Sequence, residues 1–173
     1  MGTGVCYLDA SALVKLVADD QDEEPGRAAV RKYFDSHTNK KAVPYCVAEA
    51  LSVFKRKFLS KKISREEYKN YVRAFVRTIG YLEIEEPQFS EYMGLGSRTL
   101  PTHKLLHEAE KLLNKHNLDF IDCVQIANIL HGRYSPFCGD SQSILITADE
   151  DLAKVAKAEG AKVWDCINEP PPP

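Results

Sequence analysis

Residues 5–15 read VCYLDASALVK: a short apolar run, then at once the acid Asp9, then a helix-like pattern. A short apolar run that ends at a polar residue is typical of a strand buried on both faces. Residues 144–153, ILITADEDLA, have the same order of apolar run, acid and helical pattern. Strands that alternate with helices in this way predict an α/β fold, with a central parallel sheet covered by helices on both faces.

The segments between these two stretches continue the alternation. Apolar periodicity and end signals predict strands at 4–8, 81–84, 144–146 and 161–164 and helices at 12–18, 27–36, 43–57 after an extended start, 65–79, 104–115, 119–131 and 149–159. Ser11 is the expected cap of the first helix, and Ala28, Val30, Tyr33 and Phe34 are available for the buried face of the second.

Three local signals fix helix ends more sharply. Ser64-Arg65-Glu66-Glu67 has the Ser-x-x-Glu form of a capping box, and Gly80 and Gly160 are placed to end helices. Residues 85–103 contain two prolines and two glycines with little periodicity, so we expect a long loop with at most one helical turn. Residues 135–143 are expected to form a second loop.

Length and composition bound the class of protein. The chain has 173 residues, 28% of them charged, and a formal net charge of −2. This predicts one domain over 1–169 followed by a proline tail at 170–173, and it excludes a protein that coats nucleic acid by bulk charge. Without a long apolar run or a signal-like N-terminus, we expect a soluble, cytoplasmic protein.

The five cysteines are widely spaced and form no Cys-x-x-Cys pair. This pattern favours reduced, buried thiols over a zinc site or a disulfide framework, with a bridge from Cys123 to Cys138 as the alternative. His103 and His107 have i, i+4 spacing beside Glu108, but they lack a third matched ligand for zinc.

Four acids lie in apolar surroundings: Asp9 and Asp149 after strands, and Glu49 and Asp122 within helices. Each alone fits a helix cap, a turn or an exposed helix face. Since parallel strands place ligands beyond their carboxyl ends, however, the four are expected to share one cleft. Their mutual repulsion then requires a cation, and hard oxygen ligands select Mg²⁺ or Mn²⁺.

Four motifs carry a resemblance to a known family. Residues 7–15 (YLDASALVK) resemble the opening motif of PIN-domain nucleases, the family that includes VapC-type toxins. Residues 47–50 (VAEA), 118–127 (LDFIDCVQIA) and 144–153 (ILITADEDLA) are similar to its second, third and fourth acidic motifs, in the same order. The segment at 85–103 is longer than compact toxins of this family usually carry.

The resemblance implies an α/β/α fold and a metal-dependent nuclease that usually acts on RNA. It implies catalytic and metal-binding roles for Asp9, Glu49, Asp122 and Asp149, and supporting roles for Ser11, Thr147 and Asp151. Asp119 either belongs to the site or simply starts its helix. It also suggests a homodimer, for which we expect the helices over 47–79 to provide part of the contact, and it leaves open an antitoxin partner.

An RNA substrate requires positive charge near these acids. Residues 55–77 contain nine basic and two acidic residues, a local charge of +7. Arg56 lies two helical turns after Glu49 and is the first candidate for phosphate binding, followed by Lys15; a solvated helix face is the alternative. Four aromatic side chains fit core packing better than base stacking: Tyr45, Tyr68, Tyr71 and Phe75.

The sequence favours a metal-dependent endoribonuclease, of which the toxin of a toxin–antitoxin pair is one form. Two other functions are the alternatives. A haloacid-dehalogenase-like phosphatase also has an aspartate after its first strand, but it needs another two positions later, where this chain has Ser11. A non-catalytic PIN-like RNA-binding or scaffold protein would not need the complete set of four acids.

Overall fold

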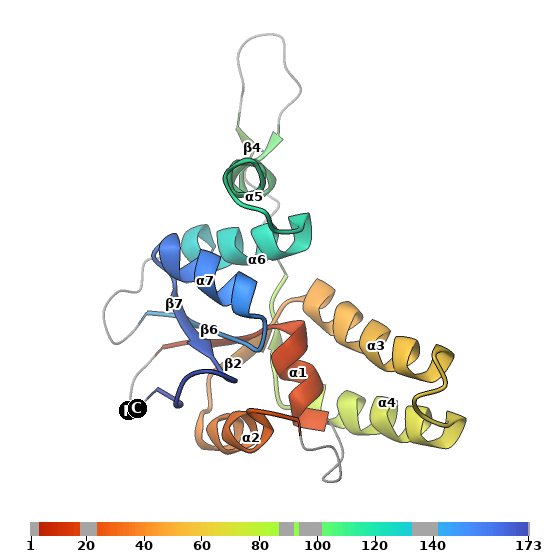
Figure 1. The fold of residues 1–173 in the computed structure, drawn as a ribbon. Helices are drawn as coiled ribbons and strands as arrows, with labels where there is room; N and C mark the ends of the chain where they lie inside the picture. The colour runs from red at the N-terminus through yellow and green to blue at the C-terminus, as the bar shows by residue number, and fades with distance from the viewer. Residues whose placement is uncertain (1–3, 18–23, 87–91, 94–101, 133–141, 173) are drawn as a thin grey trace.

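The computed structural model describes residues 4–17, 24–86, 92–93, 102–132 and 142–172 (Figure 1). Its centre is a five-stranded sheet in the order β3-β2-β1-β6-β7, in which every pair of neighbours is parallel. The strands are β1 (Cys6–Leu8), β2 (Lys40–Ala42), β3 (Glu83–Ile84), β6 (Ile144–Thr147) and β7 (Lys162–Asp165). The first strand of the chain is thus the middle strand of the sheet.

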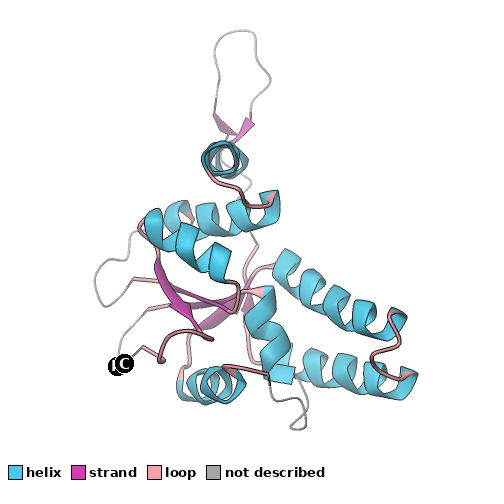
Figure 2. Ribbon diagram, in the orientation of Figure 1, coloured by secondary structure: helices cyan, strands magenta, loops and turns pink. Residues whose placement is uncertain are grey.

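Helices cover both faces of the sheet, which confirms the three-layer α/β/α architecture (Figure 2). One face carries α1 (Ala10–Val17), α2 (Arg27–Ser36), α3 (Pro44–Leu59) and α4 (Arg65–Ile79). The other face carries α5 (Lys104–Lys115), α6 (Phe120–His131) and α7 (Glu150–Ala158).

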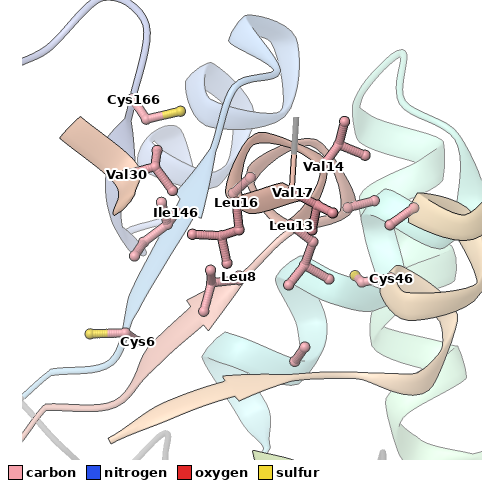
Figure 3. Close-up of a cluster of buried hydrophobic side chains, with 14 of the residues drawn as sticks. Cys6, Leu8, Leu13, Val14, Leu16, Val17, Val30, Cys46, Ile146 and Cys166 are labelled. Carbon is pink, nitrogen blue, oxygen red and sulfur yellow. The ribbon is translucent and has the colours of Figure 1, made fainter. Parts of the chain in front are cut away.

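The alternation of side chains along β1 supplies both halves of the core. Cys6 and Leu8 point into the cluster beneath α1 and α2, where they meet Ile146, Leu13 and Leu16 (Figure 3). Tyr7 points the other way, into the cluster formed with α5, α6 and α7. A strand that is buried on both faces is what an unbroken apolar run predicts.

Helices with clear local end signals match the sequence-based expectation. The predicted bounds of α2, α4 and α5 agree with the structure. Ser64 forms both halves of the capping box with Glu67, and Gly80 is the C-cap of α4. The predicted buried face of α2 was only partly right, because Val30 and Tyr33 are buried whereas Ala28 is exposed.

The observed starts of three helices differ from the predicted ones, because an aspartate immediately before each helix caps it. The expected Ser11 cap was wrong: α1 already begins at Ala10, and the Asp9 carbonyl oxygen accepts a hydrogen bond from Leu13 N. Asp119 and Asp149 likewise cap α6 and α7 rather than lying inside them. In each case a side-chain carboxylate satisfies backbone N–H groups that the first helical turn leaves unpaired.

The segment at 85–103 differs from the expected loop with a helical turn. Its described part contains two short antiparallel strands, β4 (Tyr92–Met93) and β5 (Thr102–His103). Residues 87–91 and 94–101 lie outside the described residues, as does most of the expected loop at 135–143.

Two close contacts stabilise the sheet at its edges. Gly26, the N-cap residue of α2, has a φ of 79° and lies against the C-terminal segment. A Cβ at this position would lie 2.2 Å from the carbonyl oxygen of Cys166. On β2, the side chain of Lys41 is only 1% exposed, and its Nζ lies 2.6 Å from Glu83 and 3.9 Å from Glu85. The hydroxyl of Tyr7 donates a hydrogen bond to the same Glu85 carboxylate.

The four described cysteines are free and buried: Cys6, Cys46, Cys123 and Cys166. This is the predicted state, and Cys138, the other half of the alternative bridge, lies outside the described residues. Among the described helices, none is both long enough and apolar enough to cross a membrane.

Candidate functional site

Asp9 lies at the carboxyl end of the central strand and is 5% exposed. Its Oδ2 accepts hydrogen bonds from Ser11 Oγ at 2.6 Å and from Thr147 Oγ1 at 2.9 Å. Its Oδ1 accepts one from Ala10 N at 2.6 Å. Because several donors hold both oxygens, the carboxylate has a fixed orientation at this edge of the sheet.

Ser11 and Thr147, expected from the sequence to support the acids, connect the ends of β1 and β6. The backbone N–H of Ala148 donates to Ser11 Oγ at 2.8 Å, and that of Asp149 donates to Thr147 Oγ1 at 3.0 Å. Asp149 in turn uses Oδ1 to accept a 3.0 Å hydrogen bond from Leu152 N at the start of α7. The two hydroxyls therefore position both strand-end acids.

Asp122 lies half-buried in the first turn of α6. Burial, followed by the charges of Asp119, Asp9 and Asp149 and then Glu49, raises its pKa to about 7. Since a neighbouring negative charge disfavours ionisation of a carboxyl group, this shift reports that acids from four separate segments lie near one another.

Glu49 lies on the exposed side of α3, facing the start of α6. Partial burial raises its pKa, and Asp9, Asp119 and Asp149 add to the rise, whereas Arg56 opposes it. Glu49 and Asp119 also line one groove of about 370 Å³ between α3 and the start of α6. Its full lining consists of Tyr45, Ala48, Glu49, Ser52, Arg56, Asp119 and Ile121.

From the sequence, Asp119 either belongs to the site or starts its helix. In the structure it does both. Its side chain caps α6 by accepting a 2.9 Å hydrogen bond from Asp122 N. It also lines the groove opposite Glu49 and raises the pKa of both Glu49 and Asp122. The three-residue spacing to Asp122 was the available signal, because it puts a cap beside a first-turn acid.

The donor types of this cluster suit a divalent cation. Carboxylate oxygens are the ligands that Mg²⁺ and Mn²⁺ prefer, and a cation would offset the burial and the mutual repulsion that raise the pKa of Asp122 and Glu49. As they stand, no three His, Cys, Asp or Glu side chains in the described ranges lie close enough to share one ion.

The remaining predicted residues lie in different environments. Asp151 is exposed in the first turn of α7. Arg56 is exposed at the end of the groove. Lys15 is buried, and its Nζ donates to the carbonyl of Pro25 at 2.7 Å and lies 3.7 Å from Glu24. Lys15 thus stabilises the turn at Glu24 and Pro25. These contacts do not support its predicted role in phosphate binding.

The aromatic residues on α3 and α4 divide into two groups. Phe75 is buried, Tyr71 stacks on Phe54 and Tyr68 stacks on Phe58, as core packing predicts. Tyr45 also packs against the core, touching both hydrophobic clusters, but in addition it lines the groove beside Glu49. The sequence pattern did not separate Tyr45 from the others, because all four lie among apolar residues of helices.

Comparison with known proteins agrees with this architecture. The model of the PIN domain family matches residues 6–158. The fold is similar to the crystal structure of PAE2754 from Pyrobaculum aerophilum, with a TM-score of 0.58 and 16% sequence identity over 93% of this chain and 84% of that one. No curated protein matches the chain. The extent of the family match shows that this chain belongs to the PIN domain family.

Proposed function

We propose that this protein is a metal-dependent endoribonuclease that hydrolyses phosphodiester bonds in single-stranded RNA. Membership of a family whose domains are generally nucleases supports the reaction class. The observation that carries the proposal is the gathering of acids at the carboxyl end of the central strand, where burial and the neighbouring acids raise the pKa of Asp122 to about 7. Such repulsion is the cost of a site built to hold a cation.

In this proposal, Asp9 and Asp149 provide the main metal ligands, and Asp122 and Glu49 complete the set. Mg²⁺ or Mn²⁺, when bound, lowers the pKa of a bound water and neutralises charge on the phosphate. Ser11 and Thr147 hold the Asp9 carboxylate in one orientation through hydrogen bonds of 2.6 and 2.9 Å. Such partners preserve the geometry and affinity of a metal ligand.

The basic helix pair α3–α4 is the proposed contact for the RNA backbone. Its residues 55–77 carry the +7 local charge, and Arg56 lies at the end of the groove that contains Glu49. A cationic face next to an acidic centre lets phosphates bind without placing a fixed cation among the metal ligands.

We also propose that α3 and α4 contribute to a homodimer contact, as expected from the family resemblance. Leu59 and Val76 on these helices are 65% and 62% exposed, which supports an apolar contact there. An antitoxin partner belongs to the narrower proposal that the enzyme is a toxin. Growth arrest on expression of the wild type, but not of Asp9→Asn, would support that role.

Cleavage of a labelled single-stranded RNA tests the enzyme directly. We expect cleavage by the wild type with Mg²⁺ or Mn²⁺, none in EDTA, and a loss of at least ~100-fold in Asp9→Asn and Asp149→Asn. Asp35→Asn, at an exposed acid on α2, is the matched control. Equal cleavage by all variants, or activity that resists EDTA, would contradict the mechanism. RNA binding without cleavage would favour the non-catalytic alternative.

A further inference from the structure

The groove between α3 and α6 has a feature that metal binding does not use. Three of its lining residues present apolar surface: the ring of Tyr45, Ala48 and Ile121. Ile121 is 42% exposed although it is a large apolar side chain in the first turn of α6. Apolar surface bordered by a small number of polar and charged groups is typical of a small-molecule or ligand-fragment site.

Apart from Asp119 at the start of α6, the polar groups of the groove follow one stripe of α3. Tyr45, Glu49, Ser52 and Arg56 recur every three or four residues, so they share a helix face. Ser52 Oγ donates to the carbonyl of Ala48 at 2.9 Å and keeps its lone pairs for another donor. The side chain of Arg56, at the far end, has neither an ion pair nor a hydrogen bond with the described residues, although its charge lowers the pKa of Glu49.

Tyr45 presents its ring to the groove rather than its hydroxyl. The hydroxyl oxygen is buried and has no hydrogen-bond partner among the described residues. Because the hydroxyl oxygen is buried, any contribution of Tyr45 to a ligand comes from its ring. An aromatic face next to a cation is the combination that single-stranded nucleic-acid sites use, the ring for a base and the cation for a phosphate.

We propose that this groove is a subsite for one nucleotide of the RNA strand beside the cleaved bond, with its base between Tyr45 and Ile121 and its phosphate at Arg56. The groove volume of about 370 Å³ lies in the range of sites that hold small ligands. Glu49 lines both this groove and the acidic cluster, so the subsite adjoins the metal centre. The assignment rests on the proposed ribonuclease function.

Binding, measured separately from cleavage, tests the subsite. The protein carries Asp9→Asn to stop turnover, and fluorescence anisotropy in Mg²⁺ gives the affinity for a labelled RNA of about ten nucleotides. A set of such RNAs, each with one base removed, locates the contacted base. We expect one position where base removal weakens binding about fivefold or more, the loss of one stacking contact.

Variants of Tyr45 and Ile121 then assign that contact. Tyr45→Leu should weaken binding of the intact RNA by a similar factor and should abolish the effect of removing that base, whereas Tyr45→Phe should behave as the parent. Tyr81→Leu, at a tyrosine that is 74% exposed elsewhere, is the control. Ile121→Ser repeats the test at an exposed position, where a failure to fold is not expected.

Arg56→Gln should lower the slope of log affinity against log salt by about 0.7, the value for one phosphate contact on a single strand. Lys32→Gln, at an exposed cation on α2, should leave the slope unchanged.

If removal of that base weakens RNA binding by Tyr45→Leu as much as it weakens binding by the parent protein, the subsite is overturned, even if the wild type cleaves RNA. An absence of cleavage with the predicted base coupling intact would instead overturn only the enzyme proposal.

Discussion

Thr147 Oγ1 donates a 2.9 Å hydrogen bond to Asp9 Oδ2, and so joins residues 138 positions apart in the chain. The two residues end neighbouring parallel strands, β6 and β1, whose register brings Leu8 opposite Ile146. The same threonine oxygen accepts the N–H of Asp149. One buried hydroxyl therefore sets the positions of two acids that neither strand alone could align.

Replacing this hydroxyl with a methyl group tests its role. Thr147→Val keeps the side-chain shape, and the loss of a hydrogen bond to a charged group should lower the free energy of unfolding by about 2 kcal/mol. Mn²⁺ affinity, measured by calorimetry, should fall about 10- to 100-fold. In the control, Thr78→Val, the hydroxyl bonds only a carbonyl of its own helix, that of Ala74. Equal effects in both variants would remove the special role of Thr147.

The raised pKa of Asp122 predicts a pH dependence in the metal-free protein. The folded state holds a proton up to about pH 7, whereas the unfolded carboxyl group releases it near its ordinary pKa of about 4. The contribution to stability is therefore complete below about pH 4 and disappears as the pH rises through 7. Urea unfolding in EDTA should show this decline in the wild type and a weaker one in Asp122→Asn. A pH dependence of the free energy of unfolding that is the same in Asp122→Asn as in the wild type would contradict this assignment to Asp122.

Gly26 and Gly160 form a matched pair for backbone strain. Both have positive φ, 79° and 89°, but a Cβ at Gly160 meets no atom within 4 Å, whereas one at Gly26 lies 2.2 Å from the Cys166 carbonyl oxygen. We expect Gly160→Ala to cost about 1 kcal/mol and Gly26→Ala about 1–3 kcal/mol more, as measured by urea unfolding. A smaller loss in Gly26→Ala would show that the contact relaxes without cost.

The buried Lys41 tests the ion pairs of β2 and β3. Lys41→Ala leaves the buried carboxylate of Glu85 without its cation and should lower the free energy of unfolding by about 3–5 kcal/mol. Lys41→Met combined with Glu85→Gln removes both charges and should recover most of that loss. If the double variant is no more stable than Lys41→Ala, the loss comes from packing rather than from charge.

Local signals made the fold readable from the sequence. The capping box at Ser64 and the stop at Gly80 fix α4, because these groups act within one turn of the helix that they end. The apolar runs before Asp9 and Asp149 predicted the central strands, since such runs are typical of a strand buried on both faces. Ser11 and Thr147 donate hydrogen bonds to Asp9, whereas the supporting roles that the family resemblance implies for them stay a prediction.

Features that depend on distant contacts were not readable. The pairing of Tyr92–Met93 with Thr102–His103 joins separated residues in a segment without periodicity. Lys41 is a charged residue of a type that is rarely buried, yet its ion pairs with Glu83 on β3 and with Glu85 just after it allow its burial. The groove between Tyr45 and Ile121 arises only where α3 meets α6, which no single helix pattern contains.

The position of β1 in the sheet has a consequence for the order in which the site is completed. This strand is made long before its partner β6. Until β6 is made, Asp9 has no Thr147 hydroxyl and no neighbouring Asp149. Because the contact joins residues 138 positions apart, a growing polypeptide that has not reached β6 has no assembled acidic centre, and the proposed RNA-cleaving activity would begin only after β6 is made.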